Sequence, residues 1–370
     1  MTLAPFKLER YYALYEFKAR IMLSSSDCES LSMTELLSMA PPDSLNLWNN
    51  LKLGYTETQG NPLLRAEAAR IYEHISPDNL LISAPEELIY ITMQTLLQPG
   101  DRVVVLAPAY QSLYEVAASI GCHVFYWNLH PTTQGWEADI DELKRLLTPP
   151  TRLLVMNIPN NPTGFLPSRE DLETIVNLAR ESGIILFSDE MYRLLEREPS
   201  FRLPAVCDLY ENGISLSGLS KSMALPGLRI GWLASQNTKF LEKWMGFKDY
   251  TTICNSAPSE VLGLIALQNR PNIVDRNLRI IGENIKIAQN VFTEYLHQFD
   301  WIPPRAGSIA FPRWKGKGSV EDFCRNVLDR YSVMIVPGSM FDYPGGHFRL
   351  GLGRKNFHEG MDAVVDYLKE

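Results

Sequence analysis

Residues 220–232 have the sequence SKSMALPGLRIGW, which places Lys221 eight positions before Arg229 with a Pro-Gly turn between them. A lysine becomes an amine nucleophile only when burial or a neighbouring cation lowers its pKa. The fork of N–H donors of an arginine matches the oxygens of a phosphate group. The segment therefore predicts a reactive lysine beside an anchored phosphate. The alternative is a surface lysine and a structural arginine around a turn.

Size and composition indicate a soluble globular protein. The chain has 370 residues, of which 45% are hydrophobic and 21% charged, and this length suggests about two domains. The net charge of −8 argues against a nucleic-acid partner. The five cysteines and six histidines are dispersed, so we expect no metal site. Neither a signal-peptide core nor a membrane-length apolar run is visible, which predicts a cytoplasmic protein without a membrane partner.

Several apolar runs predict an α/β fold. Runs without polar alternation, separated by helices, are typical of parallel strands that are buried on both faces. Four such runs are residues 101–108, 121–129, 151–157 and 183–189. A helix with Ser168 as its N-cap is expected between the last two runs. The pattern predicts a large domain over residues 46–280 with a mostly parallel, helix-flanked sheet.

The C-terminal part has a different pattern. Helical periodicity over 272–298 and 320–331 is interleaved with short strand-like runs. We therefore expect a smaller α+β domain, made of residues 281–370 together with residues 1–45.

Polar residues follow two of the predicted strands, where open α/β sheets bind ligands. Asn157 leads into a loop whose two prolines and glycine restrict it around Asn161. Asp189 ends the next strand, and a buried carboxylate needs a partner. A protonated pyridine nitrogen would suit, because it makes the ring an electron sink. A ligand-free rigid turn and a helix cap by Asp189 are the alternatives.

Residues 85–87, Pro-Glu-Glu, open a helix whose free amides and dipole can bind phosphate. Pro85 has no amide hydrogen, so the amides of Glu86 and Glu87 are the better candidates. We interpret both glutamate side chains as pointing away from the phosphate. Tyr110 follows a strand, and it either stacks on an aromatic ligand or packs in the core.

Arg349 lies in an otherwise apolar strand and needs a carboxylate, either from a substrate or from an internal salt bridge. Arg354 is expected on the surface. Lysine, phosphate-binding arginine and ring-binding carboxylate together form the arrangement that pyridoxal phosphate needs.

The order of these motifs resembles the fold type I pyridoxal-phosphate enzymes, specifically the class I/II aminotransferase family, from about Gly54 onward. The resemblance implies cofactor-binding roles for Tyr55, Pro85, Glu86, Glu87, Tyr110, Asn161, Asp189, Tyr192, Ser220, Lys221 and Arg229. Of these, it makes Lys221, Asp189 and Tyr192 catalytic, with Lys221 forming the internal aldimine. Asn161 and Arg349 are implied to bind the substrate.

The same resemblance implies a fold type I transferase that exchanges an amino group between amino acid and keto acid substrates. It also implies a homodimer in which Tyr55 reaches the cofactor of the partner subunit. Asn161 and Tyr192 are then the groups that bond the cofactor's 3-hydroxyl. Tyr110 stacks on its ring.

Three features depart from the family pattern. Gly218 stands where the family often has the first serine of Ser-x-Ser-Lys. Pro-Glu-Glu replaces the usual small or glycine-rich phosphate turn. Residues 24–29, SSSDCE, replace a loop that usually contains glycine or proline. The last two features resemble the branch of capreomycidine synthase-like enzymes, which act on arginine derivatives by elimination and ring closure.

The resemblance therefore leaves a lyase or cyclase on the same scaffold as an alternative to transamination. A non-catalytic ligand-sensing module, as in some transcriptional regulators, is a remote alternative, because Lys221 is intact and no basic head precedes the fold. Five residues of the N-terminal segment are candidates to approach a substrate: Tyr12, Tyr15, Phe17, Asp27 and Glu29. Asp27 or Glu29 in the site would favour a basic substrate, whereas helix capping is the alternative role.

Overall fold

The centre of the molecule is a sheet of eight strands in the order β2-β9-β8-β7-β6-β3-β4-β5. The structure, a computed structural model, describes residues 2–370. The five strands from β8 to β4 are parallel, and antiparallel pairs close both edges. The bounds are β2 Leu80–Ser83, β3 Arg102–Ala107, β4 His123–Pro131, β5 Trp136–Ala138, β6 Leu153–Asn157, β7 Ile185–Asp189, β8 Gly213–Gly218 and β9 Gly231–Ala234. The predicted α/β class is confirmed.

Both faces of the central strands β3, β6 and β7 are covered, which explains their unbroken apolar runs, whereas most residues of β4 are exposed. In β3, Val103 and Val105 join one hydrophobic cluster, and Val104 and Leu106 join another on the opposite face. Because strand side chains alternate between faces, a strand covered on both sides needs apolar residues at every position. Helices α5 and α6 belong to the first cluster, and α7 and α8 to the second.

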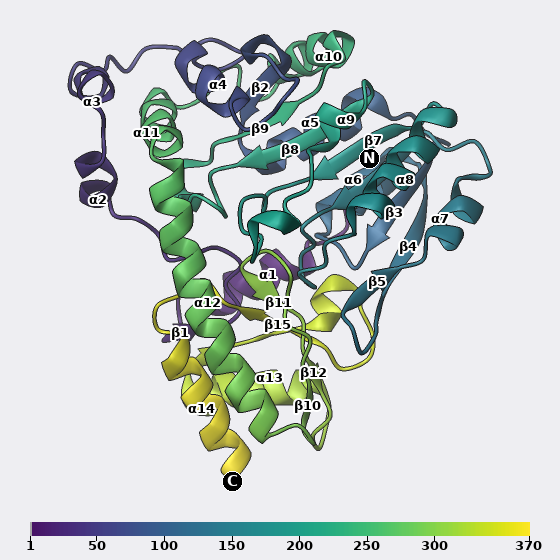
Figure 1. The fold of residues 1–370 in the computed structure, drawn as a ribbon, viewed down its shortest axis with the longest axis vertical. Helices are drawn as coiled ribbons and strands as arrows, with labels where there is room; N and C mark the ends of the chain where they lie inside the picture. The colour runs from purple at the N-terminus through teal and green to yellow at the C-terminus, as the bar shows by residue number, and fades with distance from the viewer. Residues whose placement is uncertain (1) are drawn as a thin grey trace.

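Helices occupy the connections between strands and the ends of the chain (Figure 1). Ser168 caps α8 by accepting a hydrogen bond from the N–H of Asp171, as predicted. The bounds are α1 Lys7–Tyr15, α2 Met33–Ser38, α3 Pro42–Asn49, α4 Pro62–Ala69, α5 Pro85–Leu96, α6 Ser112–Ile120, α7 Ile140–Leu147, α8 Arg169–Glu181, α9 Val206–Leu209, α10 Thr238–Lys248, α11 Ala257–Gln268, α12 Arg270–Glu294, α13 Val320–Tyr331 and α14 Phe357–Lys369. Within residues 2–370, no helix has the length and hydropathy that crossing a membrane requires.

The C-terminal part packs beside the long helix α12, which runs down much of the molecule (Figure 1). It holds the antiparallel sheet β11-β15-β14 and two strand pairs, β1-β13 and β10-β12. The bounds are β1 Ile21–Met22, β10 Phe299–Asp300, β11 Ile309–Ala310, β12 Arg313–Trp314, β13 Val333–Met334, β14 Val336–Pro337 and β15 Phe348–Gly351. The division into two domains stays a prediction, and its boundary at residue 280 falls inside α12, which is continuous.

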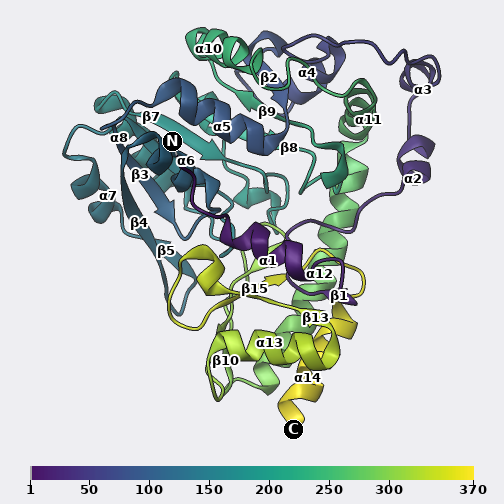
Figure 2. The same ribbon diagram turned by 180° about the vertical axis from the view of Figure 1, so that it is seen from behind.

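Helix α1 lies between the sheet and the C-terminal part in both views (Figures 1 and 2). Its first N–H, that of Lys7, donates to Gln111 Oε1 over 2.9 Å on the sheet side. The hydroxyl of Tyr11 donates to the carbonyl of Ile335 on the other side over 3.0 Å. These contacts hold α1 over the carboxyl ends of the central strands, where the polar residues of the site lie.

Candidate active site

The parallel strands β6 and β7 end at the same level, and β8 continues for two more residues, to Gly218. Asn157 pairs in register with Asp189, and Asp189 with Leu216 of β8. The loops after these strands carry Asn161, Tyr192, Ser220 and Lys221, which were far apart in the sequence. They surround one cavity of about 570 Å³. The residues predicted from the rule that ligands bind beyond the carboxyl ends of parallel strands therefore line one cavity, and their roles stay predictions.

Lys221 projects its amine into this cavity. Its Nζ donates a hydrogen bond to the hydroxyl of Ser26 over 2.8 Å. Burial lowers the pKa of Lys221, and the cations Arg349 and Arg229 add to this effect, whereas Asp27 opposes it. A lysine with a lowered pKa holds more of its amine in the neutral, nucleophilic form. Lys221 therefore has the lowered pKa that a reactive amine needs, and the anchored phosphate beside it stays a prediction. Ser26 gives the unusual 24–29 segment a contact with the lysine.

Asp189 is a buried carboxyl at the floor of the cavity. Its Oδ1 accepts a hydrogen bond from the N–H of Met191 over 3.1 Å. Burial raises its pKa to about 7, with Glu86 contributing. The residues after Asp189 form a turn and not a helix, so the helix-cap alternative does not hold. A raised pKa means that the carboxylate lacks a strong cationic partner, which a protonated ring nitrogen would supply.

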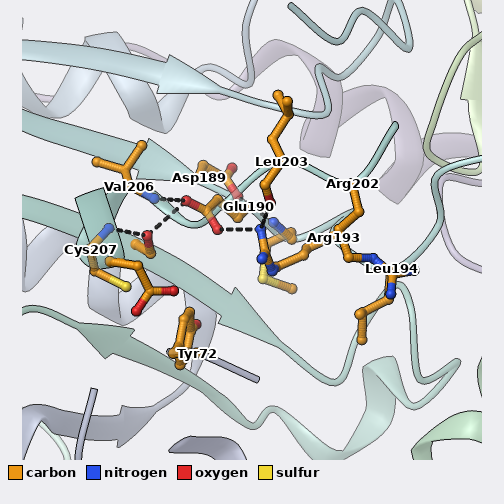
Figure 3. Close-up of polar contacts among 12 residues, drawn as sticks. Tyr72, Asp189, Glu190, Arg193, Leu194, Arg202, Leu203, Val206 and Cys207 are labelled. Atoms are coloured by element: carbon orange, nitrogen blue, oxygen red, sulfur yellow. Dashed lines mark hydrogen bonds and ion pairs between the residues drawn. The ribbon is translucent and has the colours of Figure 1, made fainter. Parts of the chain in front are cut away.

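The neighbouring Glu190 has a structural role. Its side chain turns away from the cavity and accepts hydrogen bonds from the N–H of Val206 over 3.0 Å and from the hydroxyl of Ser215 over 2.7 Å (Figure 3). Its other oxygen lies 3.5 Å from the guanidinium of Arg193. Successive residues at the end of a strand point to opposite sides, so only Asp189 can face a ligand.

Two buried hydroxyls of the cavity wall lack partners. Neither Tyr192 Oη nor Ser220 Oγ has a hydrogen-bond partner among residues 2–370. Both residues line the cavity. Because buried polar atoms are almost always hydrogen-bonded, two such atoms around one cavity indicate a polar ligand.

Asn161 is held in place by its backbone and contacts Arg349 through its side chain. Its N–H donates to Asn157 Oδ1 over 2.6 Å, which ties the loop to the end of β6. Its side-chain oxygen accepts from Arg349 Nη1 over 3.2 Å. Both residues line the cavity, so the alternative of a rigid turn with no site function finds no support here.

Arg349 is almost fully buried, with 1% of its surface exposed. Besides Asn161, it donates to the carbonyl of Ser24 over 3.1 Å and to the hydroxyl of Tyr12. All three acceptors are uncharged, so the internal salt bridge that was the alternative for Arg349 is not formed. The guanidinium therefore keeps its charge available to a carboxylate in the cavity.

Arg354 is partly exposed, with 27% of its side-chain surface accessible, and it also lines the cavity, which was not predicted. Its Nη2 contacts both carboxylate oxygens of Asp27, at 3.0 and 2.8 Å, and both residues line the cavity. Tyr12 also lines the cavity, as was predicted for the N-terminal segment, whereas Tyr15, Phe17 and Glu29 are not among the lining residues.

The two glutamates at the start of α5 point in different directions. Glu87 accepts hydrogen bonds from the hydroxyls of Ser83, Thr251 and Thr252, outside the cavity. Glu86 lines the cavity with Ser220 and Arg229. The interpretation that both point away was therefore wrong for Glu86, because adjacent helical positions differ by about 100° in direction. Pro85 also lines the cavity, and the side chain of Ala84 makes no cap.

Arg229 and Tyr110 lie on the cavity wall, and Tyr55 does not. Arg229 Nη1 donates to the carbonyl of Pro226 over 3.1 Å. The Tyr110 hydroxyl donates to Glu9 Oε1 over 2.7 Å, which leaves its ring at the cavity edge. Tyr55 is 92% exposed. Its predicted contact with a partner's cofactor stays a prediction.

Sequence reasoning missed two carboxylates near the N-terminus, that of Glu9 in α1 and that of Glu16, which directly follows this helix. Glu9, Tyr12 and Glu16 all line the cavity, at positions i, i+3 and i+7 of one helical face. Burial raises the pKa of Glu16, with Asp27 and Glu9 adding to the rise. The spacing was a usable signal, but nothing in the sequence indicated which element this face covers.

The residues of the cavity fit pyridoxal 5′-phosphate. Unpartnered Ser220, the arginine at 229 and the free amides of α5 suit a phosphate. Asp189 suits a ring nitrogen, and the unpartnered Tyr192 hydroxyl suits a ring hydroxyl. Within residues 2–370, no group of His, Cys, Asp or Glu could hold a metal ion.

Comparisons with known proteins agree with this geometry. The family model described as "Aminotransferase class I and II" matches residues 22–366. Capreomycidine synthase of Streptomyces vinaceus is 28% identical over 370 residues, covering 97% of this chain and 91% of that protein. An aspartate aminotransferase of Thermotoga maritima is also 28% identical, covering 85% of this chain and 83% of that protein.

Solved structures are similar over the whole chain. A PLP-dependent aminotransferase from Streptococcus suis has a TM-score of 0.93 and 30% identity, covering 100% of this chain and 98% of that one. The PLP-dependent cyclase OrfR has a TM-score of 0.91 and 26% identity, with the same coverage. Both an aminotransferase and a cyclase therefore share this fold closely.

Proposed function

Because this chain belongs to the class I and II aminotransferase family, whose members use pyridoxal 5′-phosphate, we propose that it transfers an amino group between an amino acid and a keto acid. The main support for the proposal is the arrangement of three side chains around one cavity. The amine of Lys221, whose pKa is lowered, lines this cavity together with the carboxyl of Asp189 and the guanidinium of Arg349. When bound, the cofactor supplies an electron sink that makes the substrate's α-hydrogen acidic.

The proposed roles follow from the contacts of each side chain. Lys221 takes the proton from the substrate α-carbon and returns it, since its amine is neutral enough to act as a base. Asp189 keeps a proton on the ring nitrogen. Arg349 and Asn161 bind the α-carboxylate and fix its orientation. Ser220, Arg229 and the first amides of α5 hold the phosphate.

The test is a product analysis with purified holoenzyme. A donor amino acid and a keto acid are mixed with the enzyme, and the expected product is the amino acid that corresponds to the keto acid. Lys221→Ala should abolish turnover and still bind the cofactor, more weakly than the wild type. Undiminished transamination by Lys221→Ala would refute the role of the lysine.

A second candidate is elimination or cyclisation of a basic amino acid. Glu9 in α1 and Glu16 directly after this helix bring negative charge to the cavity, and this favours a cationic substrate side chain. The likeness to capreomycidine synthase over 97% of the chain also supports it. The products discriminate between the two, because elimination releases a leaving group and needs no keto acid. An absorbance screen of amino acids against the holoenzyme identifies which ones react.

We also propose that the protein is a homodimer in which Tyr55 completes the cavity of the partner. Tyr55 is 92% and Leu53 84% exposed, and large exposed side chains in one segment favour an interface. Sedimentation equilibrium gives the mass of the assembly.

We propose a cytoplasmic location as well. All five cysteines are free, and three of them are buried. Free thiols are typical of a reducing compartment. Fractionation of the source cells with an antibody against the protein tests this proposal.

A further inference from the structure

Glu86 places a carboxyl in the wall of the cavity that holds the cofactor in the proposed function. It occupies the first turn of α5, and it shares the cavity with the unpartnered hydroxyl of Ser220 and the guanidinium of Arg229. A helix start, an unpartnered hydroxyl and an arginine are all donors that favour an anion. An ionised carboxylate among them would repel a phosphate dianion.

The charges around Glu86 come from several elements. Glu9 of α1 and Asp189 at the end of β7 are further carboxyls, and Arg229 is a cation. Lys221 lines the same cavity, and the hydroxyls of Ser112 and Tyr110 lie near Glu86 at the start of α6. Burial raises the pKa of Glu86 to about 7, Glu9 raises it further, and Ser112 and Arg229 oppose the rise.

We propose that Glu86 binds a proton when the cofactor's phosphate docks at the start of α5, so that cofactor affinity falls as the pH rises. A protonated carboxyl removes the repulsion and donates a hydrogen bond to a phosphate oxygen. The free enzyme loses this proton above about pH 7, so binding takes up a proton in the alkaline range. The inference rests on the cofactor and holds for either proposed reaction.

The direction and size of the expected change in cofactor affinity with pH follow from proton linkage. A ligand that prefers the protonated form loses at most about tenfold in affinity for each pH unit above the pKa of the free enzyme. The glutamine side chain in Glu86→Gln is neutral at all pH values. We therefore expect this variant to lack the loss of cofactor affinity that titration of Glu86 causes as the pH rises. Its dissociation constant should be about five- to tenfold below that of the wild type at pH 8 and similar at pH 6.5.

The experiment measures binding by isothermal titration calorimetry with 4′-deoxypyridoxine 5′-phosphate, which has a methyl group in place of the aldehyde. This probe forms no covalent bond with Lys221. Protons that the lysine would release or bind in forming such a bond therefore do not contribute to the measured proton uptake. Titrations in two buffers of different ionisation enthalpy give the number of protons taken up. The wild type should take up nearly one proton more than Glu86→Gln at pH 8.

Glu115→Gln is the control, because Glu115 lies in α6, is not among the residues that line the cavity, and accepts a hydrogen bond from the N–H of Ala4 over 3.0 Å. It should keep the pH dependence of the wild type. Equal proton uptake by wild type and Glu86→Gln would overturn the proposal.

A second measurement uses only the wild-type protein. Binding of 4′-deoxypyridoxine, which has the ring and no phosphate, should lack the extra proton uptake. The same uptake with and without the phosphate would also overturn the proposal. Neither result depends on which products the enzyme makes, so failure of the inference is separate from failure of the proposed function.

Discussion

Arg349 Nη1 donates a hydrogen bond to Asn161 Oδ1 over 3.2 Å, and this contact joins strand β15 to the loop after β6. The two residues are 188 positions apart in the chain. Because both face the cavity, the contact fixes the guanidinium at the position where a substrate carboxylate would bind.

Arg349→Lys should weaken substrate binding and spare the cofactor. An ammonium group cannot form the two parallel hydrogen bonds that a guanidinium forms with a carboxylate. We expect KM for the amino acid to rise by about 10- to 100-fold, since hydrogen bonds to charged groups contribute about 1.5–3 kcal/mol. Steady-state kinetics checks this, with the exposed Arg313→Lys as the control. An unchanged KM would contradict the assignment of Arg349.

Substitutions of the adjacent residues Asp189 and Glu190 should have different effects. Asp189→Asn should lower activity, and Glu190→Gln should lower stability. The neutral amide introduced by Asp189→Asn would not keep a proton on a ring nitrogen, so kcat should fall by about 100-fold or more. Glu190→Gln should keep cofactor binding and lose about 3 kcal/mol of unfolding free energy, because it disrupts the buried contacts with Arg193, Val206 and Ser215. Kinetics and chemical denaturation measure the two effects. Similar losses of kcat in both variants would argue against the separate roles.

Tyr55→Phe should weaken cofactor binding in the dimer by about tenfold, the effect of losing one hydrogen bond to a charged group. The decisive test is complementation. In a mixed dimer of Lys221→Ala and Tyr55→Phe subunits, one of the two cavities would contain both wild-type residues. Titration of that dimer with the cofactor should show half of the sites at wild-type affinity. If no site recovers, Tyr55 does not act across the interface.

Lys248→Met should lose stability mainly at alkaline pH. Lys248 is fully buried, and its Nζ donates to the carbonyls of Thr58 and Ile82, each over 2.7 Å, and to Asn255 Oδ1 over 3.1 Å. Burial lowers its pKa to about 8.

Above pH 8 the unfolded chain still binds the proton that the folded protein has released, so this lysine adds stability as the pH rises. The deficit of Lys248→Met should reach about 2 kcal/mol at pH 9.5 and be smaller at pH 7. Denaturation curves at both pH values give the difference. A deficit that shrinks as the pH rises would contradict the lowered pKa.

Four of the five parallel strands, β3, β4, β6 and β7, were predicted from their apolar runs, whereas β8 was not. Residues 153–156 and 185–187 are apolar, and the polar residues that end these strands, Asn157 and Asp189, mark the edge where open α/β sheets bind ligands. The edge strand β2 and its neighbour β9, four residues each, were not predicted, since strands this short carry little periodicity.

The contributions of α1 could not be predicted in full, because they depend on contacts across the whole chain. Tyr12 reaches Arg349 over 337 positions, and sequence spacing carries no information about such contacts. Glu86 was misassigned for a local reason. Two adjacent glutamates at a helix start look alike in the sequence, and only the packing of α5 decides which one faces inward.

The sheet β11-β15-β14 contains Arg349 in a strand that is among the last elements of the chain. On the ribosome, α1 and the cofactor-binding loops emerge long before β15 is synthesised. During that interval Tyr12 lacks its arginine, and the wall that Arg349 and Arg354 form is absent. Cofactor capture in its final geometry must therefore follow translation, and a chain that stops before residue 348 would present Lys221 in an open, unfinished cavity.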